Sequence, residues 1–444
     1  MQRVHLVSLG CPKNRVDSEV MVGTLQGGDY ELTDDPAQAE VIVVNTCSFI
    51  QPATEESIET VLSMARLKEE GRCQKLVVTG CMVQRYGAAL EDELPEVDHF
   101  LGTGEYHRIR QVLEARGENA PKSHVDVPLY IHDELAPRVN SWAKHSAYLK
   151  ISEGCNHRCT FCIIPQLRGK LRSRSVESLV AEAVRLASEG VRELNIISQD
   201  STAYGRDLYG KPALDRLLAA LAKVDGLHWI RLHYAYPIGM PDSLLDVLAN
   251  EPKVVPYLDM PLQHASGAML RAMKRGVTRA GQERILARVR AAVPDVAIRS
   301  TFIVGFPGER EADFDELLSF VQDQRFARLG VFPYYQEDGT SAAGLPDQVP
   351  DELRLERRDR LMAAQQAISL AQHEALIGQV LPVMVDGISS EHELLLEGRL
   401  PSQAPDVDGK VFLSSPPPGV RAGDLLTCRI TQATAYDLAG ELQG

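Results

Sequence analysis

The sequence predicts an α/β protein with three domains: a Rossmann-like parallel α/β domain, a partial (β/α)6 TIM-like barrel and a small five-stranded antiparallel β-barrel. Strand and helix signals alternate over the first ~115 residues, and a second alternation of six units begins at Ser146. Beyond residue 378, short alternating runs are separated by clusters of Gly, Pro, Ser and Asp. A length of 444 residues agrees with about three domains.

In the N-terminal domain, a cysteine follows each of three predicted strands. The strand-like runs are His5–Leu9, Val41–Val44 and Leu76–Val78, and the cysteines are Cys11, Cys47 and Cys81. Because ligands collect beyond the carboxyl ends of the strands in open parallel sheets, these thiols are expected to converge as a metal-cluster site. The alternative is that each cysteine is a small buried hydrophobic residue, which is common for free Cys.

The central region contains six strand candidates, fewer than the eight of a complete barrel. They are Ala147–Ile151, Glu193–Ile197, Trp229–His233, Tyr257–Met260, Ile298–Val304 and Leu329–Phe332. A helix rich in Arg, Glu and Ala, about Glu352–Ile377, closes this region. The predicted boundaries are 1–118 for the first domain, 119–142 for a linker, 143–373 for the core and 374–444 for the terminal barrel.

Three further cysteines, Cys155, Cys159 and Cys162, lie on one loop after the first strand of the core. The C-x3-C-x2-C spacing favours a [4Fe–4S] cluster in which one iron has no protein ligand. The alternative is a structural zinc site, which needs four closed ligands. His157 is the obvious fourth zinc ligand, but it lies between the cysteines, where one loop would struggle to close a tetrahedron.

Composition limits the classes of partner. The formal net charge is −14, whereas strong nucleic-acid binding requires a basic surface. No apolar run approaches the ~18 residues of a membrane helix, and the N-terminus has no secretory signal pattern. We expect a cytoplasmic protein in which most of the eight cysteines serve metal or catalytic roles. Cys73 and Cys428 lie outside both trios and are interpreted as surface or structural thiols.

The loop at Cys155–Cys162, with Phe161 before its last cysteine, resembles the radical S-adenosylmethionine (SAM) signature. The resemblance extends over the whole chain to the methylthiotransferases of that superfamily. It is carried by Gly10-Cys11-Pro12-Lys13-Asn14-x2-Asp17-Ser18-Glu19, Asn45-Thr46-Cys47, Thr79-Gly80-Cys81 and Phe302-Ile303-Val304-Gly305-Phe306-Pro307-Gly308-Glu309. The terminal barrel occupies the position of the family's TRAM domain.

This resemblance implies two [4Fe–4S] clusters and SAM as cofactors. The loop cluster would cleave SAM to a 5′-deoxyadenosyl radical, with Cys155, Cys159 and Cys162 as its catalytic ligands. The cluster on Cys11, Cys47 and Cys81 would supply the inserted sulfur. Expected SAM contacts are Phe161, Ser198, Gln199, Asp200, Gln263, His264, Gly305, Gly308 and Tyr334. Strand capping remains the alternative for Ser198–Asp200, and structural roles remain open for His264 and Tyr334.

The family divides by substrate: one branch modifies the β-carbon of an aspartate in small-subunit ribosomal protein S-twelve, and another modifies isopentenyl-adenosine in tRNA. The segments Asp259-Met-Pro-Leu-Gln-His264-Ala-Ser266, Glu337-Asp338-Gly339-Thr340 and Leu345-Pro-Asp-Gln-Val-Pro350 resemble the protein-modifying branch. Tyr334-Tyr335 departs from the expected Tyr-Ser pair.

Charge supports the same branch. Residues 371–444 contain four basic and ten acidic side chains, a net charge near −6, which would attract a basic ribosomal protein and repel RNA. We therefore expect a monomer that acts on this protein and receives help from sulfur-donor and electron-donor proteins. Two hypotheses remain open beside it: the tRNA reaction, and a zinc-stabilised binding module without catalysis.

Overall fold

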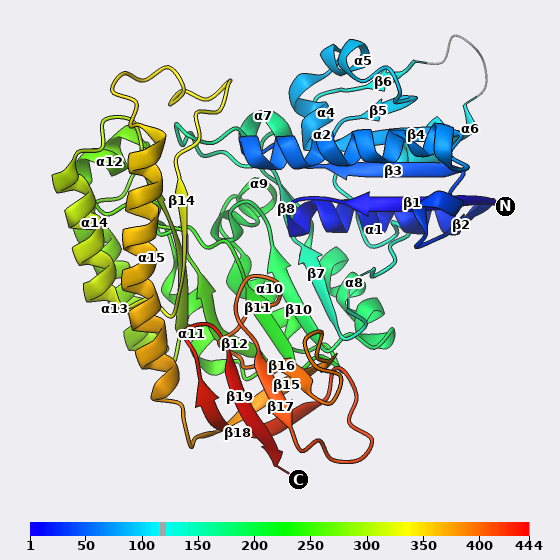
Figure 1. The fold of residues 1–444 in the computed structure, drawn as a ribbon. Helices are drawn as coiled ribbons and strands as arrows, with labels where there is room; N and C mark the ends of the chain where they lie inside the picture. The colour runs from blue at the N-terminus through cyan, green and yellow to red at the C-terminus, as the bar shows by residue number, and fades with distance from the viewer. Residues whose placement is uncertain (116–120, 142, 444) are drawn as a thin grey trace.

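The computed structural model describes residues 1–115, 121–141 and 143–443, and it has the predicted fold class. Figure 1 shows the N-terminal α/β layers at one end of the central domain and the C-terminal barrel at the opposite end. Helix α1 contacts β7, and α4 contacts α7, so the first domain lies against the start of the core. The predicted first-domain end at 118, the linker start at 119–120 and its last residue, 142, lie outside the described residues.

The N-terminal sheet has six parallel strands in the order β2-β1-β3-β4-β5-β6. Its strands are β1 (Gln2–Ser8), β2 (Tyr30–Leu32), β3 (Val41–Thr46), β4 (Lys75–Gly80), β5 (His99–Leu101) and β6 (Ser123–His124). All six residues of β3 are buried, as expected for a central parallel strand covered on both faces. The sequence predicted β1, β3 and β4, whereas the other three strands have only two or three residues and carry no periodic signal.

Helices cover both faces of this sheet (Figure 1). They are α1 (Pro12–Gln26), α2 (Gln51–Ala65), α3 (Leu67–Glu70), α4 (Cys81–Tyr86), α5 (Ala89–Glu93) and α6 (Ile109–Glu114), with short 3-10 turns η1 (Pro36–Gln38) and η2 (Tyr106–Arg108). Pro12 stands in the first turn of α1, where its missing N–H costs no hydrogen bond. Cys11 and Cys81 therefore stand at helix starts, directly beyond the strand ends.

The central sheet is parallel, with the order β14-β13-β12-β11-β10-β7, so each βα unit adds a strand beside the previous one. Its strands are β7 (Ser146–Lys150), β10 (Glu193–Ile197), β11 (Trp229–Leu232), β12 (Val254–Asp259), β13 (Ala297–Val304) and β14 (Arg328–Pro333). A two-stranded ribbon, β8 (Ser152–Glu153) and β9 (Arg172–Ser173), flanks the cysteine loop. The six predicted units are thus confirmed as a partial barrel.

The core helices are α7 (Ile164–Arg168), α8 (Val176–Ser188), α9 (Arg206–Tyr209), α10 (Leu214–Leu221), α11 (Asp242–Asn250), α12 (Gly267–Ala272), α13 (Arg279–Ala292) and α14 (Glu311–Gln324), with the 3-10 turn η3 (Ser201–Ala203). Most core helices pack their apolar faces on this sheet in one large hydrophobic cluster, whereas α7 and α12 belong to two smaller clusters. The long helix α15 (Asp351–Glu374) packs on β14 and leads into the terminal barrel (Figure 1).

The C-terminal barrel is closed, with the strand order β15-β16-β17-β19-β18. Its strands are β15 (Val380–Ile388), β16 (Leu396–Arg399), β17 (Val411–Ser414), β18 (Leu425–Ala433) and β19 (Leu438–Gln443). The pair β17–β19 is parallel, whereas the other pairs are antiparallel. Closure of five short strands into a barrel leaves no open sheet edge.

The loop between β16 and β17 inserts into the concave side of the core sheet. Ala404 is buried against Trp229 and Tyr257, and the Tyr257 hydroxyl donates to Asp408 at 2.8 Å. Asp406 lies 3.3 Å from Arg15 of α1. This loop therefore fills part of the barrel that six strands leave open.

The predicted linker makes buried contacts with both neighbouring domains. Arg138 lies 2.6 Å from Glu19 of α1 and 2.6 Å from Glu182 of α8. Burial opposes the charge, but these two carboxylates raise the pKa of Arg138 above its usual range. A buried cation with two acidic partners resists separation, because either orphaned charge would be strongly destabilising. The connection is therefore an ordered clamp between the first domain and the core.

Candidate active site

The three-cysteine loop is held by its backbone between β8 and α7. Gly154 begins it with a φ of +83°, and a Cβ at this position would collide with the Lys170 carbonyl oxygen, so only glycine fits. The Cys155 amide donates to the Gly169 carbonyl at 3.0 Å, and the Cys162 amide donates to the Cys159 carbonyl at 3.2 Å. Three thiols thus project from one short, well-anchored segment.

Burial makes these thiols hard to ionise on their own. It raises the pKa of Cys155 to about 11 and that of Cys162 to about 12. The Arg275 guanidinium lies 3.4 Å from the Cys159 sulfur and can donate to it. Cluster ligands must be thiolates, so binding of iron would release protons here. Three close thiols with a neighbouring cation fit the chemistry of a [4Fe–4S] cluster.

The second trio is assembled from three strand ends. Cys11 follows β1, Cys47 follows β3 and Cys81 follows β4. A Cβ on Gly10 would lie only 2.9 Å from the Cys47 sulfur, so the loop after β1 passes directly over that thiol. Burial raises the pKa of Cys47 to about 12, with smaller contributions from Cys81 and Cys11. The three thiols therefore share one buried environment.

Neither trio has the geometry of a site for a single metal ion. Within the residues that the structure describes, no three His, Cys, Asp or Glu side chains converge on one ion position. A four-iron cube takes each thiolate on a different iron, so its protein ligands need not share one ion. His157, the fourth ligand of the zinc alternative, instead lies 2.6 Å from the Asp200 carboxylate.

A buried network of charges connects the two trios. Arg168, at the end of the helix that follows the cysteine loop, lies 2.7 Å from Asp17 of α1 and 3.2 Å from Glu153. Its other nitrogen lies 3.6 Å from the Cys81 sulfur. Lys150 completes the network with an ion pair to Asp17 and a 2.8 Å contact to Glu153. Burial alone would raise the pKa of Glu153, but Lys150 and Arg168 lower it well below its usual range.

A cavity of about 380 Å³ opens beside the cysteine loop. Its lining includes Cys155, His157, Asp200, Tyr236 and Arg275. The His157 ring stacks on Tyr236 with centroids 3.9 Å apart, and Arg275 lies 4.3 Å from the centroid of the same ring. This cavity is large enough for a small organic ligand and combines aromatic surface with both signs of charge.

The predicted residues that follow β10 have distinct environments. The Ser198 hydroxyl is buried against that of Ser201 at 3.0 Å. The Gln199 amide nitrogen donates to Glu153 at 2.6 Å, whereas its buried Oε1 has no hydrogen-bond partner among the described residues. Asp200 caps η3 by accepting from the Ala203 amide at 3.2 Å and faces His157. Gln199 therefore presents a free acceptor at this strand end.

The remaining predicted contacts are more enclosed. His264 is buried and its Nε2 lies 3.2 Å from Glu309, while its Nδ1 accepts from the Ser266 amide at 3.0 Å. Tyr334 packs edge-on against Phe306, with ring centroids 5.2 Å apart, in a cluster that Phe161 also touches.

The backbone positions among the predicted contacts also differ from one another. Gly305 has a φ of +70° and no room for a side chain beside Arg354, whereas Gly308, with a φ of +80°, faces open space. Gln263 bridges to Phe302 with a φ of +74°, which is uncommon for a residue with a side chain.

Sequence reasoning assigned no role to several buried charges at this interface. Lys13, Asp17, Lys150, Glu153 and Arg168 are all buried where the first domain meets the core. Lys13 and Asp17 stand one helical turn apart in the motif after Cys11, which is the only local signal for them. Their partners lie more than 100 residues away, so pairing could not be read from the sequence.

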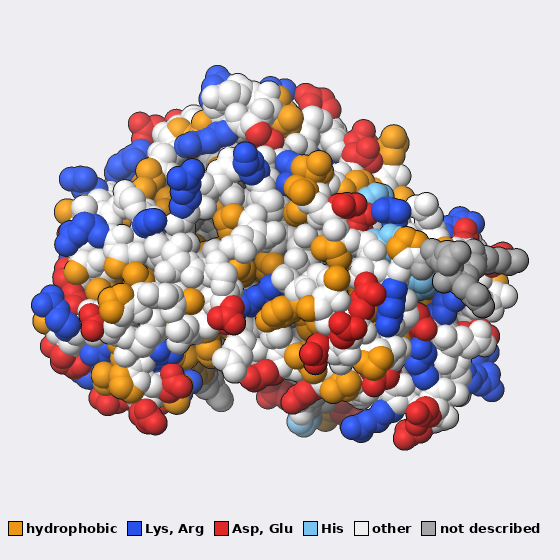
Figure 2. Space-filling model, turned by 90° about the horizontal axis from the view of Figure 1, so that it is seen from above, with side chains coloured by type: hydrophobic (Ala, Val, Ile, Leu, Met, Phe, Trp, Pro, Cys, Tyr) orange, Lys and Arg blue, Asp and Glu red, His pale blue; other side chains and the backbone are white. Residues whose placement is uncertain are grey.

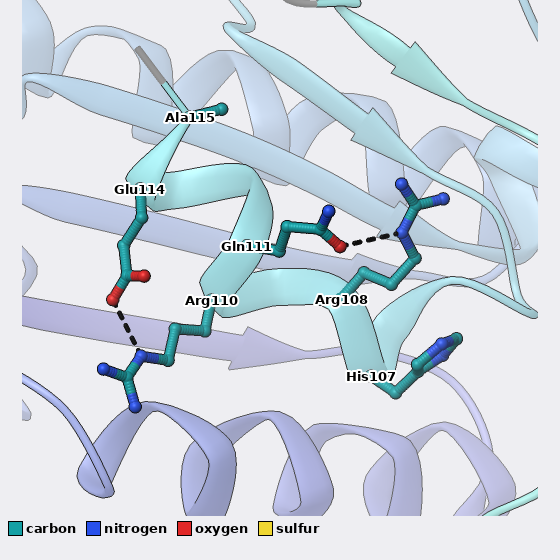
Figure 3. A pocket seen from close by; sticks show the side chains of 6 residues that line it. All are labelled: His107, Arg108, Arg110, Gln111, Glu114 and Ala115. Atoms are coloured by element: carbon teal, nitrogen blue, oxygen red, sulfur yellow. Dashed lines mark hydrogen bonds and ion pairs between the residues drawn. The ribbon is translucent and has the colours of Figure 1, made fainter.

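A surface hollow along α6 lies away from both trios. Figure 3 shows it along α6, with Arg110 paired to Glu114 and Arg108 to Gln111. The Leu113 carbonyl accepts from Lys75 at 2.6 Å, and Lys75 begins β4, so this hollow is near the strand starts. Open-parallel-sheet ligands bind at the opposite edge, beyond the strand ends. The hollow is therefore not the candidate site.

Basic side chains on the surface and at the barrel offset part of the chain's acidic charge. On the face seen from above, Lys and Arg side chains are interspersed with Asp and Glu (Figure 2). Asp386 of the barrel pairs with Arg399, and Asp408 pairs with Arg299 of the core strand β13, so part of the barrel's acidity is neutralised. The described residues contain no helix that is long and apolar enough to span a membrane.

Three parts of the chain match known families. Residues 3–102 match the "Uncharacterized protein family UPF0004", residues 149–321 the radical SAM superfamily and residues 377–442 the TRAM domain. The ranges coincide with the N-terminal sheet, most of the core and the terminal barrel. The radical SAM match brings SAM and an iron–sulfur cluster as the cofactors of this superfamily.

Relatives resemble the chain over nearly its full length. A protein of Anaeromyxobacter sp. (strain K) named "Ribosomal protein uS12 methylthiotransferase RimO" is 55% identical over 99% of this chain and 93% of its own. Relatives with the same name in Geobacter sulfurreducens and Myxococcus xanthus are 49% and 52% identical over 99% of this chain and 98% and 91% of their own.

Solved structures share the fold. The radical SAM methyltransferase TsrM from Kitasatospora setae, solved with cobalamin and a [4Fe-4S] cluster, has a TM-score of 0.56 at 16% identity over 77% of each chain. The cobalamin-dependent SAM radical enzyme OxsB has a TM-score of 0.52 at 14% identity over 83% of this chain and 56% of its own. With the sequence relatives, they lead to one conclusion: the chain belongs to the RimO family of radical SAM methylthiotransferases.

Proposed function

We propose that this protein inserts a sulfur atom and a methyl group at the β-carbon of an aspartate in ribosomal protein uS12. The observation that carries the proposal is the presence of two thiol trios in adjoining domains, with Arg168 contacting Cys81 of one trio and Glu153, two residues before Cys155 of the other. One trio alone would account for radical formation only. A second trio beside it adds a place from which sulfur can be delivered. The names of the full-length relatives supply the substrate.

In this proposal each trio holds a [4Fe–4S] cluster: Cys155, Cys159 and Cys162 one, and Cys11, Cys47 and Cys81 the other. With SAM bound, the first cluster would supply radical chemistry able to remove hydrogen from an unactivated carbon. The chain's own residues would orient the cofactors and stabilise the charge of the thiolates. Arg275 supports the Cys159 thiolate, and Arg168 supports that of Cys81.

We assign SAM binding to the cavity beside the loop and to the neighbouring strand ends. The free Oε1 of Gln199 suits an ammonium donor, and the Ser198–Asp200 backbone lies at the same strand end. Gly308 and the Phe161 ring would border the nucleoside side. Gly305, Gln263, His264 and Tyr334 would act mainly by shaping these walls, since Gly305 is closed by Arg354 and His264 is closed by Glu309.

The protein substrate is favoured over tRNA adenosine by charge as well as by the relatives. The chain carries a net charge of −14, and a ribosomal protein that binds RNA is basic. We propose that the enzyme works in the cytoplasm as a monomer with separate sulfur-donor and electron-donor proteins. Domain limits at 118, 143 and 374 suit this division of labour, with the three family matches lying inside them.

The substrate is tested by comparing uS12 and tRNA nucleosides from cells with and without the gene. The expected result is a methylthio mass increment on the uS12 aspartate that disappears in the deletion, while tRNA nucleosides stay unchanged. Loss of methylthio-adenosine with intact uS12 modification would instead support the tRNA alternative. Complementation with a Cys47→Ala copy should fail to restore the mass increment.

A further inference from the structure

Lys13 places a buried positive charge without a carboxylate ion pair at the interface between the first domain and the core. It stands in the first turn of α1, two residues after Cys11, and its side chain is 7% exposed. Its ammonium lies 3.1 Å from the centroid of the Tyr234 ring. Buried lysines usually pair with a carboxylate, so a ring as the main neighbour calls for an explanation.

The carboxylates near Lys13 are already engaged elsewhere. Asp259 lies 3.3 Å from Arg299 and accepts from the Tyr234 amide at 3.4 Å. Glu153 is bound by Lys150 at 2.8 Å and by Arg168 at 3.2 Å. Among the residues that the structure describes, no carboxylate lies within ion-pair distance of the Lys13 nitrogen. Lys13 therefore has no carboxylate partner among the described residues, and Cys11, as a thiolate, would be its main anionic neighbour.

Tyr234 is held as a platform under this ammonium. It follows β11 with a φ of +59°, a strained value for a residue with a bulky side chain. The Ser201 amide donates to the Tyr234 carbonyl at 2.9 Å, which fixes this turn between β10 and β12. An aromatic face stabilises a cation without neutralising it and leaves its N–H donors free.

We propose that Lys13 binds the side-chain carboxylate of the target aspartate. This inference rests on the proposed function and adds the group that recognises the substrate. Lys13 stands two residues after Cys11 of one trio, on the helix whose Asp17 pairs with Lys150 and Arg168 of the core, and Arg168 also pairs with Glu153, two residues before Cys155 of the other trio. In aspartate the carboxyl carbon is bonded directly to the β-carbon. A clamp on the carboxylate therefore fixes the reacting carbon within one bond and rejects a neutral substrate.

The test is a double-mutant cycle that combines one substitution in the enzyme with one in the peptide. Two uS12 peptides are compared, one with the target aspartate and one with asparagine in its place, for binding to anaerobically reconstituted holoenzyme. Wild type should bind the aspartate peptide about 10- to 100-fold more tightly than the asparagine peptide, because a charge-assisted hydrogen bond is lost. Lys13→Met should abolish this preference, and Lys13→Arg should retain part of it.

Two controls test whether the effect is specific to Lys13 and to the substrate carboxylate. Lys223→Met, at an exposed position in the turn after α10, should leave the preference unchanged. SAM affinity and iron content should be unaltered in Lys13→Met, which distinguishes the substrate carboxylate from that of SAM and reports intact folding. If the methionine variant does not fold, Lys13→Gln replaces it.

The possible outcomes distinguish failure of the Lys13 assignment from failure of the proposed function. A wild type that prefers aspartate and a Lys13→Met variant that prefers it equally would overturn the inference alone. Weaker SAM binding with an unchanged peptide preference would assign Lys13 to SAM and also overturn it. A wild type that neither binds nor modifies the aspartate peptide would reject the proposed function itself.

Discussion

The two thiol trios are built in opposite ways. Cys155, Cys159 and Cys162 belong to eight consecutive residues, anchored by local backbone hydrogen bonds. Cys11, Cys47 and Cys81 come from three strand ends and depend on the whole N-terminal sheet. The first trio should therefore tolerate disturbance of the domain interface, whereas the second should respond to any change that loosens that sheet or its contact with the core.

The largest expected effects come from removing single cysteines. Cys159→Ala should abolish 5′-deoxyadenosine formation altogether, because the loop trio loses a ligand. Cys47→Ala should preserve deoxyadenosine formation yet eliminate the methylthio product. Chromatography of the nucleoside and mass spectrometry of the peptide measure both. Loss of deoxyadenosine in Cys47→Ala would show that the trios are not independent.

Removing Arg168 should damage the second trio more than the first. Arg168→Met leaves Asp17 and Glu153 short of a buried partner, which costs about 3–5 kcal/mol of folding free energy. Urea unfolding measures this cost, and iron content reports the trios. The matched control is Arg216→Met, whose ion pair with Glu177 is exposed by 56% and 71%, so its effect should stay below about 1 kcal/mol. Equal losses in the two variants would contradict the buried-network interpretation.

Acid should weaken a third interface, the one between the core and the terminal barrel. Glu193 is buried with Arg399 of the barrel at 2.7 Å and Arg231 at 3.0 Å. Burial opposes its ionisation, but the two arginines lower its pKa from 4.5 to about 2. This stabilisation is fully present above pH 4.5 and is lost as the pH falls toward 2.

The comparison of wild type with Glu193→Gln makes this measurable. Their difference in unfolding free energy should shrink by up to about 3 kcal/mol between pH 5 and pH 2. A difference independent of pH would argue against the lowered pKa. At pH 7 the variant should keep both clusters, since Glu193 lies at the barrel end of the core.

The smallest effect is expected at the contacts of Glu337 with Arg85 and Gln51, beside the segment that follows Cys47. Glu337, in the loop after β14, pairs with Arg85 at 2.8 Å and accepts from the Gln51 amide at 2.6 Å. Arg85 also donates to the Ser48 carbonyl at 3.0 Å. Glu337→Gln should cost about 2 kcal/mol and speed iron loss to a chelator from the second trio only. Faster iron loss from both trios would contradict the expectation that the two trios respond independently.

Much of the architecture was predictable because short segments of the sequence carry its signals. The buried run Val41–Thr46 and the cysteine after it identify a central strand and its carboxyl end. Short strands such as β6, with two residues, carry no period, and the parallel pair β17–β19 depends on closure of the barrel. Cys73 and Cys428 are both buried in hydrophobic clusters, which supports the structural interpretation over the surface one.

The interface was the least predictable part of the site. Arg168 and Asp17 are 151 residues apart, and Arg138 was part of an apparently featureless linker. His157 was weighed only as a zinc ligand, whereas the fold directs it to Asp200 and Tyr236. Such pairs form when domains dock, so no periodicity or spacing within one element reveals them.

The most direct test of the central claim is the iron content of anaerobically purified protein and two variants. Two independent cubes predict about eight irons per chain in wild type and about four in each of Cys159→Ala and Cys47→Ala. Electron paramagnetic resonance of the reduced samples should show a different remaining cluster in each variant. Wild type with about four irons, or with zinc in place of iron, would contradict the account of two trios with separate tasks.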